Sequence, residues 1–489
     1  MSLEPQRAPL YEMLETHAGL GTAPFHVPGH KQRSTWQHPQ ADHRYEALLP
    51  LDVTELPDTD DLHHSYGAII EAERLAAQCF GAEETRFLIG GSTAGNLAMI
   101  LGVSSPGDLL IVQRNVHRSI VHGLMIAGIK AVFLQPKIEP HTGLALIPDI
   151  AAVEEAVARY PEARGLLLST PNYYGRSAEI RTIVRLCHGA GIPVLVDEAH
   201  GPHFGLHPSF PCSALQSGAD VVVQSAHKML TAMTMGAMLH FQGSLVDREP
   251  IRAALRMVQS SSPSFPILAS LDLARRQVHM QGSAAFEPAL EAVKYVRDNL
   301  PDTAFRALGN IGATPIEVTQ DPLKLVLYDP SGQWSGFRIR EELASRGCVA
   351  EMADTRYAVL AFGAGSRPED GRALIRALME MTETYAETGH SETKAPFPDL
   401  HLSETAYAIS EPVVFRRSLP PTARVRLDES VGRTAGEWVV PYPPGIPELF
   451  PGEPITEAAL SRIRSWRDQA ASIQGPEDPA LGFIRVLQK

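Results

Sequence analysis

The sequence predicts an α/β protein built around a central, mostly parallel β-sheet. The main observation is an alternation of short apolar runs and helical patterns between residues 70 and 245. Wholly apolar runs are typical of strands buried on both faces, and helices between them favour parallel strands. The second observation is size, because 489 residues with 44% hydrophobic residues can bury a large core. That length suggests about three domains.

Six apolar runs are predicted to be strands of this sheet: Leu109–Val112, Ala131–Leu134, Leu166–Ser169, Ile192–Val196, Val221–Val223 and Ala237–Phe241. Ile150–Ala158 and Ile180–Ala190 have helical patterns. The uncharged stretch 87–107 is long enough to span a bilayer. Its Gly, Ser, Thr and Asn content instead favours a buried turn and helix.

Four segments are predicted along the chain: an N-terminal segment with a large domain (1–285), a small α+β domain (286–385), a polar, Pro-containing linker (386–400) and a C-terminal α+β domain (401–489). The small domain is expected to open with a helix over 286–300. The last domain is expected to end in a helix that starts near Thr456, whose side chain suits an N-cap.

Charge and cysteine content exclude several classes of protein. The formal net charge of −13 argues against a nucleic-acid partner, since binding a polyanion needs a basic surface. The four cysteines lie far apart without a CxxC pair, which fits a reducing cytoplasm and predicts neither a disulfide scaffold nor a zinc site. The N-terminus lacks an apolar signal core. We therefore expect a cytoplasmic protein with no membrane span and no metal.

Lys228 is the first candidate for chemistry. It ends the tetrapeptide Ser225-Ala226-His227-Lys228, directly after an expected strand and before small and apolar residues. An apolar setting disfavours the charged form of a lysine, and a neutral amine can form a Schiff base with a carbonyl. On this tetrapeptide alone, a surface lysine beside a loop is an equally weighted alternative.

Asp197 is the second candidate, because the apolar strand before it ends in this carboxylate. Pyridoxal phosphate (PLP) needs a carboxylate against its pyridine nitrogen, which keeps that nitrogen protonated so that the ring accepts electrons. The alternative is an aspartate that caps a helix. The presence of Lys228 and Asp197 in one α/β frame favours a PLP site.

Two further segments suit a phosphate and an aromatic ring. Gly90–Asn96 opens an expected helix, where backbone N–H groups and the Ser92 and Thr93 hydroxyls can receive a phosphate. His117 follows an expected strand, where a flat side chain can stack on a pyridine ring. Each signal is weak alone, since Gly-Ser turns begin many helices and most histidines after strands do no stacking.

The combination resembles the Orn/Lys/Arg decarboxylase family of fold-type-I PLP-dependent enzymes, and in particular its shorter bacterial arginine/lysine decarboxylase-like members. The segments that carry the resemblance run nearly from end to end: PFHVPGHK (24–31), LDVTELPDTDDLHH (51–64), FLIGGSTAGN (87–96), GDLLIVQRNVHRS (107–119), STPNYYG (169–175), VLVDEAHGPHFGLHP (194–208), ADVVVQSAHKML (219–230), SSSPSFPILASLD (260–272) and VVPYPPGIPELFPGE (439–453).

The resemblance implies the fold-type-I PLP-dependent transferase fold, and decarboxylation of arginine, lysine or ornithine to a polyamine-type amine. It implies four catalytic residues: Lys228, which carries PLP; Asp197, against the pyridine nitrogen; His117, stacked on the ring; and His227, which returns a proton to the α-carbon. The cofactor-binding residues that it implies are Ser92, Thr93, Ala94, His117, Asp197, Ala199, His200, Ser225, His227, Lys228 and Ser264. It also implies a homodimer or higher homo-oligomer with the active site at the dimer interface, where the segment around Ser264 reaches the partner's site.

One departure and three alternatives remain. Met235 stands where many relatives have a hydrogen-bonding residue, which puts one cofactor or substrate contact in doubt. The same scaffold could serve a PLP-dependent aminotransferase or lyase, or a protein without activity. A metal enzyme could use His200, His203 and His207, although their spacing is not that of a metal motif. Candidate carboxylates for the distal cation of a basic substrate are Glu55, Asp58, Asp60, Asp61, Glu437 and Glu453.

Overall fold

A computed structural model describes residues 3–309, 318–387, 408–442, 445–468 and 471–488. The contacts within the chain divide it into two compact units, each made of two segments. Unit 1 consists of Met1–Val103 and Leu195–Glu287, and unit 2 of Ser104–Val194 and Pro288–Lys489.

The strands of unit 1 follow one another in the order β1-β10-β9-β8. β8 and β9 run parallel, whereas β10 is antiparallel to both β9 and β1. Every residue of β8, β9 and β10 is buried, as expected for strands covered on both faces. The bounds are β1 (Glu84–Leu88), β8 (Val194–Asp197), β9 (Val221–Gln224) and β10 (Ala237–Phe241). Because β8 and β9 are parallel, the residues that follow them leave the sheet at the same edge.

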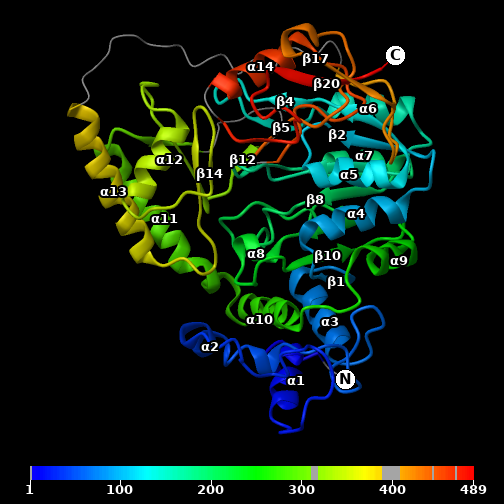
Figure 1. The fold of residues 1–489 in the computed structure, drawn as a ribbon, viewed down its shortest axis with the longest axis vertical. Helices are drawn as coiled ribbons and strands as arrows, with labels where there is room; N and C mark the ends of the chain where they lie inside the picture. The colour runs from blue at the N-terminus through cyan, green and yellow to red at the C-terminus, as the bar shows by residue number, and fades with distance from the viewer. Residues whose placement is uncertain (1–2, 310–317, 388–407, 443–444, 469–470, 489) are drawn as a thin grey trace. The chain divides into compact units, whose positions relative to one another are not determined.

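The helices of unit 1 form two groups, as Figure 1 shows. In one, α4 packs along α9 and over β9 and β10; in the other, α1, α3 and α10 pack on one another. Gly102 permits the close contact of α4 with α9, because a Cβ there would lie 2.6 Å or less from Ile251 backbone atoms. The bounds are α1 (Pro9–Ala18), α2 (Pro39–Tyr45), η1 (Leu49–Leu51), α3 (Ala68–Phe80), α4 (Gly91–Val103), α8 (Ala226–Met229), α9 (Arg248–Val258), α10 (Phe265–Gln281) and η2 (Gly282–Phe286).

Unit 2 has strands in the order β6-β2-β3-β16, in which β2 is parallel to β6 and β3 and only β16 is antiparallel to its neighbour. These strands are β2 (Leu109–Gln113), β3 (Lys130–Leu134), β6 (Leu166–Ser169) and β16 (Val413–Val414). The connecting elements are α5 (Arg118–Ala127), β4 (Pro136–Ile138), β5 (Ala145–Pro148), α6 (Ile150–Arg159), β7 (Arg176–Ala178) and α7 (Arg181–Gly189).

A second, four-stranded antiparallel sheet lies in unit 2, in the order β11-β13-β15-β14. Its segment comprises α11 (Glu287–Asn299), η3 (Leu300–Asp302), β11 (Arg306–Ala307), β12 (Val318–Gln320), β13 (Lys324–Tyr328), α12 (Gly336–Ser345), β14 (Met352–Ala353), β15 (Ala358–Ala361) and α13 (Pro368–Glu387).

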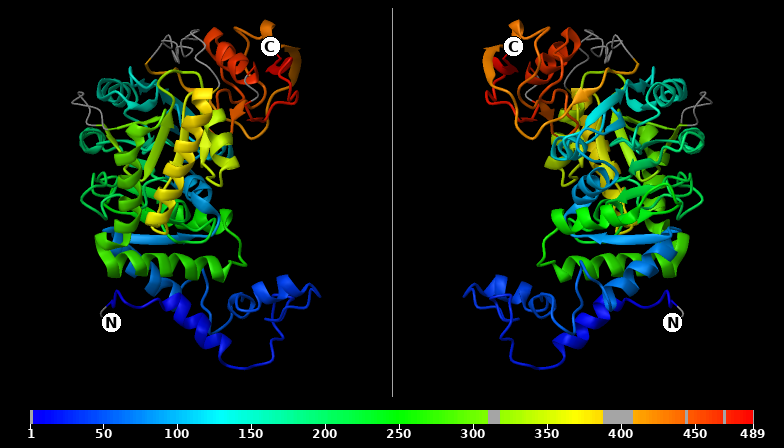
Figure 2. Two further views of the ribbon diagram at one scale, coloured as in Figure 1. Left: turned by 90° about the vertical axis from the view of Figure 1, so that its left-hand side faces the viewer. Right: turned by 90° about the vertical axis from the view of Figure 1, so that its right-hand side faces the viewer.

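The last part of unit 2, coloured orange to red in Figure 2, is a small α+β group. Its elements are β17 (Thr422–Arg426), η4 (Leu427–Glu429), β18 (Val440–Pro441), α14 (Glu457–Asp468), β19 (Ile473–Gln474) and β20 (Phe483–Leu487). β17 pairs with β20 and β18 with β19. One apolar cluster, which includes Val439, Leu449 and Ile463, holds the group together. Thr456 caps α14 by accepting from the Ala459 N–H at 3.2 Å, as predicted.

All six predicted sheet strands are found, with ends that differ by at most two residues. The predicted α/β fold with a mostly parallel centre is confirmed, and 87–107 contains a helix, α4, as expected. No helix among the described residues is long and apolar enough to cross a membrane. Apart from its first two residues, which end α13, the predicted linker 386–400 lies outside the described residues. The domain boundaries remain a prediction.

Candidate active site at the ends of β8 and β9

Lys228 lies in the four-residue helix α8, which follows β9 and has Ser225 as its N-cap residue. The Nζ atom of Lys228 lies 3.0 Å from Nε2 of His200, which follows β8. Lys228 is half-buried and His200 is 5% exposed, so their contact is largely shielded from water. An amine and an imidazole at this distance can exchange a proton between the two nitrogens.

Asp197 is the last residue of β8 and is 4% exposed. Its Oδ2 accepts a hydrogen bond from Nδ2 of Asn96 at 2.9 Å, and its Oδ1 accepts from the Ala199 N–H at 3.1 Å. Two donors on a buried carboxylate fix its orientation. The structure therefore presents a fixed, buried carboxylate at the same sheet edge as Lys228.

A loop from α8 to β10 holds His227 in one tautomer. The Nδ1 atom of His227 lies 3.0 Å from the Gly236 carbonyl oxygen, and its backbone N–H donates to the same oxygen at 3.1 Å. A carbonyl only accepts, so Nδ1 carries a proton and Nε2 is the atom that exchanges one. The neighbouring Met235 has a left-handed backbone (φ 76°), and its carbonyl accepts from the Gly91 N–H at 2.9 Å. Its side chain is 49% exposed, so Met235 contributes to this site through its backbone.

The first turn of α4 carries the predicted phosphate-binding residues. Ser92 and Thr93 are at least partly exposed there, whereas Ala94 is buried. α4 approaches β9 closely because residue 95 is glycine: a Cβ on Gly95 would lie 2.5 Å from Cγ2 of Val223. This contact brings the positive end of the helix dipole to the sheet edge where Lys228 lies, a suitable place for an anion.

The hydroxyl of Ser225 gives a direct test of whether the site fits a phosphate-bearing cofactor. Its Oγ is buried and has no hydrogen-bond partner among the described residues. A buried, unsatisfied hydroxyl destabilises a fold by about 1–3 kcal/mol, so such a group calls for a polar ligand. Together with the Lys228 amine and the Asp197 carboxylate, this hydroxyl fits PLP.

The two remaining predicted residues are each the N-cap residue of a helix. Ser264 is the N-cap of α10, and its carbonyl accepts from the Leu268 N–H of that helix. His117 belongs to unit 2, where it is the N-cap of α5 and accepts through Nδ1 from the Ser119 N–H at 3.2 Å.

A buried polar chain behind the site was missed from the sequence. Glu198 accepts from Gln224 at 2.7 Å and from the Ala214 N–H at 2.8 Å. Gln224 in turn contacts His240 at 3.1 Å, and His240 contacts Thr85 at 2.8 Å. The chain thus connects β8, β9, β10 and β1. Polar residues inside otherwise apolar strands were the available signal.

The pKa values in this chain follow from burial. Burial raises the pKa of Glu198 to about 8, against the hydrogen bonds from Gln224 and Ala214. Burial lowers the pKa of His240 to about 3, so its imidazole stays neutral. A neutral imidazole fits the geometry, in which Nε2 donates to the Gln224 oxygen and Nδ1 accepts from the Thr85 hydroxyl.

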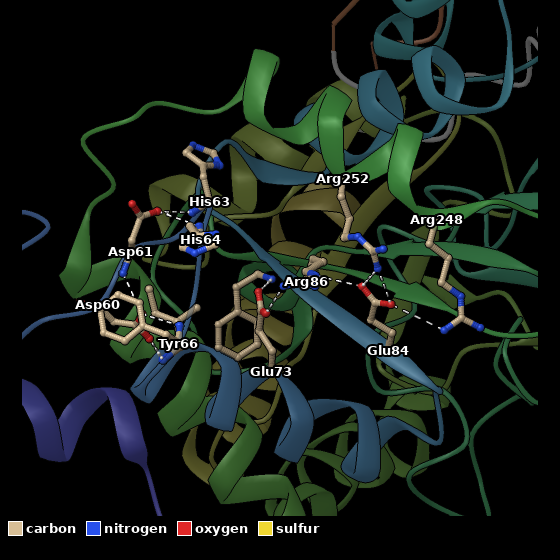
Figure 3. A network of polar contacts seen from close by, with 12 residues as sticks. Asp60, Asp61, His63, His64, Tyr66, Glu73, Glu84, Arg86, Arg248 and Arg252 are labelled. Atoms are coloured by element: carbon tan, nitrogen blue, oxygen red, sulfur yellow. Dashed lines mark hydrogen bonds and ion pairs between the residues drawn. The ribbon is translucent and has the colours of Figure 1, made fainter.

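The six carboxylates considered for a distal cation have structural roles. Asp60, drawn in Figure 3, is 3% exposed and accepts four backbone N–H groups, from Asp61, Tyr66, Gly67 and Ile69, at 2.8–3.0 Å. The other five also have partners within the fold: Asp58 with His17, Glu55 with the Leu62 N–H, Asp61 with the N–H groups of His63 and His64, Glu437 with those of Glu477 and Arg485, and Glu453 with Arg114.

A pocket lined in part by residues 62–65 also contains arginines that are already paired. Arg86 pairs with Glu73, while Arg252 binds Glu84 at 3.0 Å. Figure 3 shows these pairs beside β1. Because each guanidinium faces a carboxylate, this pocket lacks the unbalanced charge that an anion site needs.

The histidines weighed as metal ligands have separate surroundings. His200 contacts Lys228, His203 lies among Phe204, Phe210 and Phe286, and His207 pairs with Glu287. Within the described ranges, no three or more His, Cys, Asp or Glu side chains gather as a metal site.

Comparison with known proteins agrees with this geometry. Residues 8–345 match the family model described as Orn/Lys/Arg decarboxylase, major domain, and residues 415–474 match that of the C-terminal domain. An arginine decarboxylase of Bacillus subtilis is 32% identical over 100% of this chain and 99% of its own. The structure of the Francisella novicida lysine decarboxylase LdcF is similar, with a TM-score of 0.81, 20% identity and coverage of 100% of this chain and 82% of that one. A structure of SPT with PLP gives a TM-score of 0.54 at 16% identity, over 78% of this chain and 84% of that one.

The fold thus places the protein in the fold-type-I class of PLP-dependent enzymes. More narrowly, the chain belongs to the Orn/Lys/Arg decarboxylase family. The predicted family, fold class and enzyme class, an amino-acid decarboxylase acting on a basic substrate, are confirmed.

Proposed function

We propose that this protein decarboxylates L-arginine to agmatine, with L-lysine and L-ornithine as weaker substrates, in the cytoplasm. The observation that carries the proposal is the 3.0 Å contact of Lys228 with His200 beside the buried Asp197 carboxylate, at one edge of a parallel strand pair. The preference for arginine is supported by the arginine decarboxylases among the relatives.

We propose that unit 1 holds PLP through the predicted residues that it contains. Lys228 provides the amine for the covalent link, Ser92, Thr93 and Ser225 receive the phosphate, and Asp197 faces the ring nitrogen. PLP supplies an electron-accepting ring that stabilises the charge left when the carboxylate departs. The unsatisfied Ser225 hydroxyl and the doubly hydrogen-bonded Asp197 carboxylate support this assignment.

The side chains account for the proton movements. Decarboxylation replaces the α-carboxylate with one proton, so carbon dioxide leaves and a donor must reach Cα. His200 can take a proton from, or return it to, the Lys228 amine across their 3.0 Å contact. Nε2 of His227 is the proposed donor to Cα, because Nδ1 is held by the Gly236 carbonyl. Asn96 and the Ala199 N–H hold the Asp197 carboxylate in the orientation that the ring nitrogen requires.

We also propose a homodimer in which the segment around Ser264 reaches the partner's site. Its support is an N-terminal segment of unit 1 with exposed apolar side chains, among them Phe25 (94% exposed), Val27 (62%) and Trp36 (51%). Several large apolar side chains exposed within one short segment are compatible with an interface. Light scattering of the purified protein is expected to give twice the chain mass or more, and a monomer would contradict this part of the proposal.

The activity is tested with a panel of L-amino acids in the presence of PLP, with amines identified by mass spectrometry and carbon dioxide trapped. Agmatine and gas from arginine support the proposal, and norleucine should react at least ~10⁴-fold less efficiently because it leaves buried polar groups unpaired. A parallel assay adds 2-oxoglutarate as amino acceptor. Keto acid without gas would show an aminotransferase, and gas only from apolar amino acids would contradict the substrate class.

A further inference from the structure

The C-terminal part of unit 2 contacts the turn that carries His117. This turn joins β2 to α5 and follows the strand directly. The Arg118 N–H donates to the Gly445 carbonyl at 3.1 Å, and the Arg118 side chain donates to Gln474 at 2.7 Å. The contacts therefore involve both the backbone and the side chains of the turn.

Arg114 fixes the same turn more firmly. Its guanidinium donates to both carboxylate oxygens of Glu453, at 2.7 and 2.6 Å. It also donates to the carbonyls of Pro447 and Glu448 at 3.0 Å and lies 4.8 Å from the Phe450 ring centroid. The side chains of Arg114 and Glu453 are only 12% and 17% exposed. A bidentate, largely buried pair with further carbonyl acceptors allows little movement.

Gly445 lies directly against the imidazole of His117. Its φ is +86°, and a Cβ there would lie 3.2 Å from Nε2 and 3.3 Å from Cδ2 of His117. On the opposite edge of the ring, Nδ1 of His117 accepts from the Ser119 N–H and lies 2.8 Å from the Ser119 hydroxyl. The ring is thus held between Ser119 on one edge and the Gly445 backbone on the other.

We propose that Gly445 is a positioning residue that sets the orientation of the His117 imidazole, and that the C-terminal domain takes part in catalysis through this contact. The proposal rests on the proposed function and on the stacking of His117 on the cofactor, which the family resemblance implies. It assigns the Arg114–Glu453 pair the task of holding Gly445 in place. A stacked ring must be held within about 0.5 Å and 10–20° of its productive orientation, which a fixed backbone does better than a mobile side chain.

Gly445→Ala tests the contact, and Gly432→Ala is its matched control. Gly432 lies in the same C-terminal group, has a similar φ of +76°, and a Cβ there meets nothing within 4 Å. Both substitutions impose the same left-handed strain, so both should lower Tm by similar amounts. Only Gly445→Ala should change the visible circular dichroism of the PLP-loaded enzyme and lower kcat for arginine, by about 10- to 100-fold, with a smaller change in KM. Equal spectra and equal kcat for the two variants would overturn the proposal.

A double-mutant cycle shows whether Gly445 acts through His117. In a His117→Ala background, Gly445→Ala should have no further effect on kcat or on the spectrum. If Gly445→Ala lowered kcat by the same factor in both backgrounds, the positioning role would be overturned. Decarboxylation by the wild type would still leave the proposed function intact. Absence of decarboxylation by the wild type would instead contradict the proposed function. If Gly445→Ala does not fold, Arg114→Lys takes its place, because it removes the bidentate pair with Glu453. This variant should shift the same dichroism band, and an unchanged band would overturn the proposal.

Discussion

At the scale of single residues, the site follows from where two parallel strands end. Asp197 closes β8, and Lys228 lies one short helix beyond β9. Neighbouring side chains point to opposite sides, so Asp197 meets Asn96 of α4 while Glu198 meets Gln224. The end of β8 therefore supplies the Asp197 carboxylate to the active site and the Glu198 carboxylate to the interior of the sheet.

The assignment of Lys228 gives the first residue-scale prediction. Borohydride reduction of the PLP-loaded enzyme should label Lys228 and no other lysine, because its amine lies in the site beside His200 and a lysine amine can form a Schiff base. Lys228→Ala should lose the yellow colour of the linked cofactor and its turnover. Peptide mapping after reduction checks the assignment, and label on a different lysine would exclude it.

Asp197→Asn keeps the shape of the side chain but removes its charge. We expect an unchanged fold and a fall in kcat of at least ~10²-fold, comparable to the loss of one preorganised electrostatic group. Steady-state kinetics with arginine at saturating PLP measures this. Asn96→Ala serves as the comparison and should lower kcat by a smaller factor, because the Ala199 N–H still holds the Asp197 carboxylate. Near-normal turnover of Asp197→Asn would remove Asp197 from this role.

At the scale of elements, the chain from Glu198 to Thr85 connects four strands and carries a pH dependence. In the folded protein the pKa of Glu198 is raised by burial to about 8, from an ordinary value of 4.5. Between these values the folded protein holds a proton that the unfolded chain has released, so stability falls as pH rises from about 5 to 8. Each pH unit in that window lowers the free energy of unfolding by about 1 kcal/mol.

Glu198→Gln removes this titration. Its Tm should therefore fall less than that of the wild type between pH 5 and pH 8, whatever the offset between the two curves. Thermal unfolding of both proteins across that range measures the difference. Parallel curves would show that Glu198 does not titrate there.

The packing of α4 on β9 gives a second prediction at this scale. Gly95→Ala places a Cβ 2.5 Å from Cγ2 of Val223 and 2.8 Å from Cδ1 of Leu88. Overpacking of this kind lowers the free energy of unfolding by about 1–3 kcal/mol. It should also displace the turn that contains Ser92 and Thr93, and PLP should therefore bind more weakly. Adding Val223→Ala should restore part of the affinity, measured by PLP titration. A double variant as weak as Gly95→Ala would exclude this contact as the cause.

The sequence predicted some of the strands and missed others. The central strands were predictable because their residues are mostly apolar and all buried, as in β2 and β10. β1 was not, because its sequence ETRFL mixes charged and apolar residues. Strands of two residues, such as β18 and β19, leave no periodicity to detect.

The candidate site was predictable in part. Lys228 and Asp197 follow apolar strands, which marks their positions, and His200 stands close behind Asp197. Asn96 was not predicted as a partner of Asp197, because their contact joins residues far apart in the chain. Likewise, Asp60 has the residue type of a cation ligand, but folding surrounds it with backbone N–H groups.

At the scale of the whole molecule, each unit combines two separate stretches of chain. In unit 1, the residues around Ser92 and those around Lys228 come from stretches separated by Ser104–Val194, which belongs to unit 2. The cofactor site therefore exists only after both stretches have folded together. PLP, which binds this assembled site, should raise Tm in proportion to the logarithm of its concentration above Kd. A Tm that is independent of PLP would contradict the placement of the site within unit 1.

The central claim is that the enzyme exchanges the α-carboxylate of L-arginine for a single proton. Its most direct test is the reaction in D₂O, with carbon dioxide trapped and agmatine examined by mass spectrometry and NMR. We predict one carbon dioxide per agmatine and one deuterium at the former Cα, with no product from Lys228→Ala. Agmatine without deuterium at that carbon, or consumption of arginine without carbon dioxide, would contradict the account.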